Sequence, residues 1–194
     1  DFRMLMISAC SSSMMNYPLA CSGQNQSYKK NVFKNVNGYS KIIDLLQGDD
    51  SIFLQICRKK KNLKVSFSVD KNSYVIAKTH NKWKNFILQR IRWAGDANIM
   101  WKYNKIFFLI IISTFFANFF IISLLFYNAF RLFFTLIILK FIFEFLIYFI
   151  GSKKMHLKVN KLFFIQWYVI QIPYIVFMGF SSFFTGYLSW KGRN

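Results

Sequence analysis

Two short motifs contain the residues of this sequence that are best suited to chemistry. Gly48-Asp49-Asp50 supplies two adjacent carboxylates, and Gln89-Arg90-Ile91-Arg92-Trp93 follows later in the chain. A carboxylate beside a hydroxyl group can act as a general base. Arginine offers planar, forked donors to a diphosphate, glutamine adds neutral hydrogen bonds, and tryptophan offers a flat face to a ring. These residue types predict a site that deprotonates an acceptor and stabilises a departing phosphate group.

The second motif has a spacing that places its polar side chains on one face of a helix. Gln89, Arg92 and Trp93 stand at positions i, i+3 and i+4, which project from the same side. The surrounding segment 81–104 has helical periodicity and mixes basic side chains with tryptophan and tyrosine. This mixture favours a helix that lies along a membrane interface. The alternative is a packed globular helix with a basic face.

Asp50 is expected at the N-terminus of a helix, because residues 51–60 have helical spacing and begin with a serine. The backbone N–H groups and the dipole of that helix would help to keep the carboxylate ionised. An ionised carboxylate held at an acceptor hydroxyl suits a direct displacement reaction. The alternative is a simple turn followed by a helix cap, since aspartate is among the preferred N-cap residues.

The composition indicates a membrane protein. Hydrophobic residues make up 55% of the 194 positions and the mean hydropathy is +0.29, yet the formal net charge is +19. Such a chain fits a membrane protein whose lysines and arginines follow positive-inside topology and attract anionic lipid headgroups. Besides positive-inside topology and attraction to headgroups, nucleic-acid binding could also explain the positive charge. Because the same chain contains apolar spans, we expect membrane lipids and no nucleic acid as partners.

Three apolar segments fill most of the second half of the chain. Segments 106–127 and 132–150 are each long enough to cross a hydrocarbon layer as a helix. Segment 162–187 is interrupted by Pro173, and we expect either one kinked span or a pair of short re-entrant helices. The basic loop 151–161 should be cytoplasmic. Three full crossings cannot place this loop, the basic residues before the first span and the basic tail on one side.

Lys140 and Glu144 lie inside the second span at positions i and i+4. At this spacing the two side chains can neutralise each other within a helical bundle. Ionisable residues inside a membrane suggest a functional site by default. A structural lock between helices explains the pair equally well.

The residues before the spans predict a mixed α/β domain. We expect helices over 1–15, 30–36 and 51–60, and the second should end at Asn37-Gly38, a pair that suits left-handed backbone. We expect strands over 17–22, 63–69 and 73–79. The alternation of apolar and polar residues from 63 to 69 supports the second strand, and Asp70-Lys71-Asn72 would form the hairpin turn to the third.

The motifs and their order resemble those of family 2 glycosyltransferases, membrane enzymes that include cellulose, chitin and hyaluronan synthases. In that family a (T/G)-(E/D)-D motif precedes Q-(Q/R)-x-R-W, and both precede the membrane region. Further likeness lies in Cys21-Ser22-Gly23-Gln24-Asn25, Tyr28-Lys29-Lys30, Phe33, Asn37-Gly38-Tyr39 and the tail Trp190-Lys191-Gly192-Arg193. Asn37 stands where the family usually has glycine. The resemblance covers nearly the whole chain.

The resemblance implies an inverting transfer of sugar from a nucleotide sugar to a lipid-linked or glycan acceptor. It implies a multi-pass protein of the cell inner (cytoplasmic) membrane, with its catalytic part on the cytoplasmic face. It assigns the role of general base to Asp50 and a supporting role to Asp49. The residues that it implies for substrate binding are Gln89, Arg90, Arg92, Trp93 and Gly23.

The resemblance also divides the chain into parts. It implies the acceptor side of a GT-A type domain at 1–80, the motif helix at 81–105, a transmembrane region at 106–188 and a basic tail at 189–194. It implies a divalent metal, Mg or Mn, but the sequence contains no D-x-D motif to bind it. We therefore expect this chain alone to be incomplete and inactive. The alternative is a small basic membrane anchor or interaction protein without catalytic activity.

Overall fold

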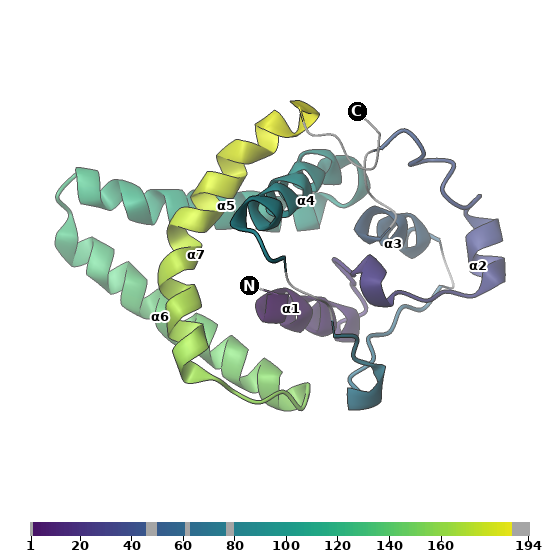
Figure 1. The fold of residues 1–194 in the computed structure, drawn as a ribbon, viewed down its shortest axis with the longest axis horizontal. Helices are drawn as coiled ribbons and strands as arrows, with labels where there is room; N and C mark the ends of the chain where they lie inside the picture. Colours follow the sequence, from purple (N-terminus) through teal and green to yellow (C-terminus); the bar gives the residue numbers. More distant parts are fainter. Residues whose placement is uncertain (1, 46–49, 61–62, 77–79, 188–194) are drawn as a thin grey trace.

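The computed structural model describes residues 2–45, 50–60, 63–76 and 80–187. The α-helices are α1 (Phe2–Met14), α2 (Lys30–Asn35), α3 (Ser51–Arg58), α4 (Trp83–Tyr103), α5 (Lys105–Phe126), α6 (Phe130–Lys154) and α7 (Lys161–Ser181). Three short 3-10 helices are η1 (Gly23–Asn25), η2 (Lys71–Ser73) and η3 (Ser182–Tyr187). In Figure 1, α5 and α6 form two arms that meet at one end, while α7 crosses both and ends beside α4.

Three helices in the described part of the chain are long and apolar enough to cross a membrane. They cover Lys105–Phe126, Phe130–Lys154 and Lys161–Phe184, which confirms the three predicted apolar helices and indicates a multi-pass membrane protein. The third is one continuous helix through Pro173, so the interpretation as a pair of short helices is wrong. Where α7 crosses α5, a Cβ added to Gly179 would overlap the ring of Phe115. A glycine is therefore required at this close approach.

The prediction of a mixed α/β, GT-A type domain is wrong, because the residues that the structure describes form no strand. Residues 63–70 form neither a helix nor a strand, and the expected hairpin turn is η2, capped by the Asp70 side chain. The alternating Phe67 and Val69 pack against buried residues of α1, α6 and α7. Their alternation thus reflects one buried side of a single segment. Of the strand predicted over 73–79, the last three residues lie outside the described part.

The predicted strand before η1 is held by side chains of α3 instead of a neighbouring strand. The Gln55 amide nitrogen donates to the carbonyls of Pro18 at 3.1 Å and Leu19 at 2.8 Å. The Ser51 hydroxyl accepts from the Cys21 N–H at 3.3 Å and donates to the Cys21 carbonyl at 3.1 Å. Backbone groups that a sheet would satisfy therefore bond to one helix.

Two buried amides join α3 to the junction of α4 and α5. Gln55 is completely buried, and its Oε1 accepts from Asn104 Nδ2 at 2.8 Å and from Arg58 Nε at 2.9 Å. Asn104 Oδ1 accepts from the Tyr17 hydroxyl at 3.2 Å and from the Phe107 N–H at 3.0 Å, which caps α5. The start of the first membrane helix is thereby linked to the segment that precedes η1.

Several helices end at residues with left-handed backbone, which stops the helix and turns the chain. These residues are Asn16, Asn37, Gly38, Asn128 and His156, with φ between 54° and 60°. Asparagine adopts this conformation more readily than most residues. The predicted stop at Asn37-Gly38 is confirmed, since α2 ends at Asn35. Asn16, Asn128 and His156 end helices in the same way and were not predicted.

We expect Asn104→Ala to destabilise the protein, because it leaves the buried Gln55 Oε1 without one donor and removes the cap of α5. Loss of one partner of a buried hydrogen bond costs about 1–3 kcal/mol, and loss of a cap costs about 1 kcal/mol more. The measurement is the thermal midpoint of the detergent-solubilised protein by circular dichroism. Asn85→Ala, an exposed position on α4, is the control, and equal shifts for the two variants would contradict the link.

Candidate functional site

Asp50 and Gly23, two predicted site residues from different parts of the sequence, are in contact. Asp50 is the N-cap of α3, as its predicted place at the helix start requires. Its Oδ1 accepts from the Ser51 N–H at 2.5 Å, and its Oδ2 accepts from the Gly23 N–H at 3.3 Å. The side chain is half-buried. Two backbone N–H groups therefore fix a carboxylate that solvent can still reach.

The rest of the first motif cannot be placed beside Asp50. Gly48 and Asp49 lie outside the described residues. The supporting role predicted for Asp49 therefore stays a prediction.

The second motif lies on α4, in the helical conformation that its spacing predicts. Gln89, Arg92 and Trp93 are all half-buried. The helix that carries them contacts α5, α7 and η3, and the Asn98 amide nitrogen donates to the Ser182 carbonyl at 2.9 Å. The motif helix is therefore packed against the membrane helices along part of its surface, as Figure 1 shows.

Arg90 is the most buried residue of the motif, with an exposed fraction of 8%. Its guanidinium carbon lies 4.1 Å from the ring centre of Trp93 and 4.8 Å from that of Phe86. Burial lowers the pKa of the Arg90 guanidinium, while the neighbouring Tyr174 of α7 raises it. Arginine stays charged in such surroundings because its ordinary pKa is very high. Arg90 thus lies against two aromatic rings of its own helix. Its predicted role in substrate binding stays a prediction.

Within the described residues, no hydrogen bond joins the Asp50 carboxylate to the second motif. Both hydrogen bonds of its carboxylate in the described structure go to Gly23 and Ser51. The helices α3 and α4 instead meet near their C-terminal ends, where Lys59 Nζ donates to the Lys102 carbonyl at 3.3 Å. The structure therefore brings Asp50 and Gly23 together, and leaves the motif on α4 as a second group of candidate residues.

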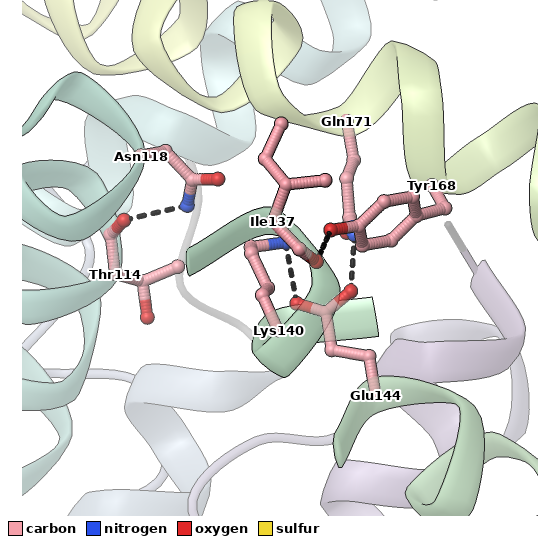
Figure 2. A network of polar contacts seen from close by, with 7 residues as sticks. All are labelled: Thr114, Asn118, Ile137, Lys140, Glu144, Tyr168 and Gln171. Atoms are coloured by element: carbon pink, nitrogen blue, oxygen red, sulfur yellow. Dashed lines mark hydrogen bonds and ion pairs between the residues drawn. The ribbon is translucent and has the colours of Figure 1, made fainter. Parts of the chain in front are cut away.

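A polar network joins α6 to α7 among apolar side chains (Figure 2). Lys140 Nζ and Glu144 Oε1 form an ion pair at 2.6 Å, which confirms the predicted i, i+4 contact. The Gln171 amide nitrogen donates to the other Glu144 oxygen. The Tyr168 hydroxyl donates to the Ile137 carbonyl at 2.5 Å, and Lys140 Nζ lies 5.0 Å from the Tyr168 ring centre. The pair is thus also a contact between two helices.

The partners of this ion pair on α7 were not predicted from the sequence. Gln171 and Tyr168 stand one turn apart in an apolar segment, and a polar side chain inside such a segment was the available signal. Asn118 of α5 gives the same signal. It is 1% exposed, and its Nδ2 donates to the Thr114 carbonyl at 2.8 Å (Figure 2). The buried amides of Gln171 and Asn118 therefore lie where these helices pack.

The described residues offer no ligand set for the divalent metal that the resemblance implies. Among them, no group of three or more His, Cys, Asp and Glu side chains lies close enough together to hold a metal ion. Asp50, for example, bonds to backbone N–H groups. No step of a reaction is therefore assigned to a metal here.

Comparisons of the chain with protein-family models, with curated proteins and with solved structures give no match. The resemblance to family 2 glycosyltransferases therefore depends on the motifs of this sequence alone.

We expect Glu144→Ala to weaken the packing of α7 on α6, because Lys140 loses its counter-ion and Gln171 its acceptor. Hydrogen bonds to charged groups contribute roughly 1.5–3 kcal/mol. The double variant Lys140→Ala with Glu144→Ala should recover part of this loss, since no unbalanced charge remains in the apolar region. The measurement is the thermal midpoint in detergent.

The control for this experiment is Thr135→Ala, an exposed position on the same helix. We expect it to leave the midpoint almost unchanged. Lys140→Ala is measured as well, and a double variant whose loss equals or exceeds the sum of the losses in Glu144→Ala and Lys140→Ala would contradict the pairing.

Proposed function

We propose that this chain forms the acceptor side and the membrane part of an inverting glycosyltransferase. The reaction would move a sugar from a nucleotide sugar to a lipid-linked or glycan acceptor at the cytoplasmic face of the membrane. The observation that supports this most is the Asp50 carboxylate, fixed by the Gly23 N–H and still open to solvent. The proposal concerns the reaction and does not include the α/β GT-A fold, which the described residues lack.

In the proposed reaction, Asp50 accepts the proton of the acceptor hydroxyl as its oxygen attacks the anomeric carbon. The new glycosidic bond forms while the bond to the nucleoside diphosphate breaks, which inverts the configuration at that carbon. Arg92 and Gln89 stabilise the charge on the departing diphosphate, and Trp93 provides a face for the sugar ring. Since no hydrogen bond joins Asp50 to these residues in the described part of the chain, the substrate would lie between the two groups.

A second candidate function is a membrane anchor or interaction protein without catalysis. The burial of Arg90 favours it, because this side chain, which also lies over Phe86 and Trp93 of its own helix, then serves to pack α4 within the molecule. Under this alternative the protein transfers no sugar, and substitutions in the motif change only its stability. Binding and stability measurements on one variant therefore separate the two functions.

We expect Asp50→Asn to reduce sugar transfer by at least about a hundredfold, the lower end of what a general base contributes. Asparagine keeps an oxygen that can cap α3 but cannot take up the acceptor proton. Transfer of labelled sugar is measured in membranes that contain either the natural protein or its Asp50→Asn variant. Binding of the nucleotide sugar is measured in the same membranes and should be equal for the two.

The matched control is Asp70→Asn. Asp70 caps η2 through the same kind of bond, with its Oδ1 accepting from the Asn72 N–H at 2.9 Å. Full activity of the Asp70 variant with loss in the Asp50 variant supports the base. Undiminished transfer in the Asp50 variant would remove Asp50 from this role.

We expect Arg92→Ala to weaken both the binding of a nucleoside diphosphate and the transfer reaction. Loss of a charged hydrogen bond costs roughly 1.5–3 kcal/mol, which corresponds to about a tenfold to hundredfold weaker affinity. UDP and GDP are the probes for titration calorimetry, and Lys84→Ala, exposed on the same helix, is the control. A variant that melts earlier while its affinity stays equal to that of the control would favour the packing role.

A further inference from the structure

A cavity of about 360 Å³ opens where the C-terminal ends of α2, α3 and α4 meet. Lys41, Lys59, Lys60 and Lys102 line it together with Asn37 and Tyr103. No carboxylate is among its described lining residues. Its volume lies within the range of about 300–1,000 Å³ that is usual for small-molecule sites. The cavity therefore combines concave shape with one sign of charge.

The positive charge of the cavity exceeds what the helix ends around it can balance. A helix C-terminus carries roughly half a negative charge, so three ends supply at most about 1.5 charges against the four lysines that line the cavity. Of the four lysines, Lys59 donates a hydrogen bond to a helix C-terminus, because its ammonium group binds the Lys102 carbonyl at the end of α4. Within the described residues, Lys41, Lys60 and Lys102 form no ion pair. An anion in the cavity would relieve the repulsion among these lysines.

The cavity lies at the expected boundary of the membrane. Lys102 and Tyr103 form the end of α4, and α5, the first membrane helix, begins at Lys105. Trp101 in the same turn is half exposed, at 50%. Tryptophan, tyrosine and lysine gather at the depth of lipid headgroups. A phosphate at this level belongs to a lipid more readily than to a dissolved metabolite.

We propose that this cavity binds the phosphate of an anionic phospholipid, with Lys59, Lys60 and Lys102 around it. The ammonium groups neutralise the phosphate. With the phosphate beside Tyr103 and the start of α5, the acyl chains of the lipid lie along the first membrane helix. Free inorganic phosphate has the same chemistry but lacks the acyl chains. The proposal does not depend on glycosyl transfer, since none of these lysines belongs to the proposed reaction.

The test is a titration of the purified protein in neutral detergent with phosphatidylglycerol or phosphatidylcholine, followed by native mass spectrometry. The pocket variant carries Lys59→Gln, Lys60→Gln and Lys102→Gln. The control variant carries Lys64→Gln, Lys71→Gln and Lys84→Gln, which removes the same charge from exposed positions outside the cavity. Because a lysine near a lipid surface contributes about fivefold to affinity, the pocket variant should bind phosphatidylglycerol at least about tenfold more weakly.

The control variant should bind phosphatidylglycerol nearly as well as the unchanged protein, which should prefer it to phosphatidylcholine. Equal affinity of the two variants, or equal affinity for the two lipids, would overturn the proposal. Displacement of the lipid by an equal concentration of inorganic phosphate would overturn the lipid assignment. If the triple variant does not fold, Lys41→Gln alone tests the same cavity, and an affinity equal to that of Lys64→Gln would overturn the proposal.

Discussion

The contact between the buried amides of Gln55 and Asn104 is the constraint on which the rest of the arrangement depends. Asn104 caps the first membrane helix, while Gln55 binds the backbone at Leu19, upstream of η1. Most buried amides have their donors and acceptors bonded, as these two do. The same helix α3 begins at Asp50, which binds Gly23. A single short helix therefore fixes the candidate base relative to the membrane boundary.

Much of the helical structure could be predicted from the sequence, because its signals are local. Apolar length predicts the three membrane helices, and Asn37-Gly38 predicts the end of α2. The prediction of strands was wrong for a physical reason. Alternation at Phe67 and Val69 shows that one side of the segment is buried, but it does not say against what. Here helices cover that side, and the Gln55 side chain replaces the partner strand that the backbone near Leu19 would need.

The candidate site was predictable where a residue contacts others that are close to it in the sequence. Asp50 before a helix predicts a cap with bound N–H groups, and the structure has one. The contact of Asp50 with Gly23 and the burial of Arg90 depend on how distant segments meet, which one sequence does not specify. The same holds for Gln171 on Glu144. The motif on α4 thus combines residues suited to diphosphate binding with an arginine used in packing.

The anomeric configuration of a transferred sugar tests the central claim most directly. Membranes that contain the natural protein are given labelled α-linked nucleotide sugars, and the product is analysed by nuclear magnetic resonance. A single displacement with Asp50 as base predicts a β-linked sugar in the lipid or glycan fraction. Retention of the α configuration, or no transfer from any nucleotide sugar, would contradict the account and favour a structural role for the motif on α4.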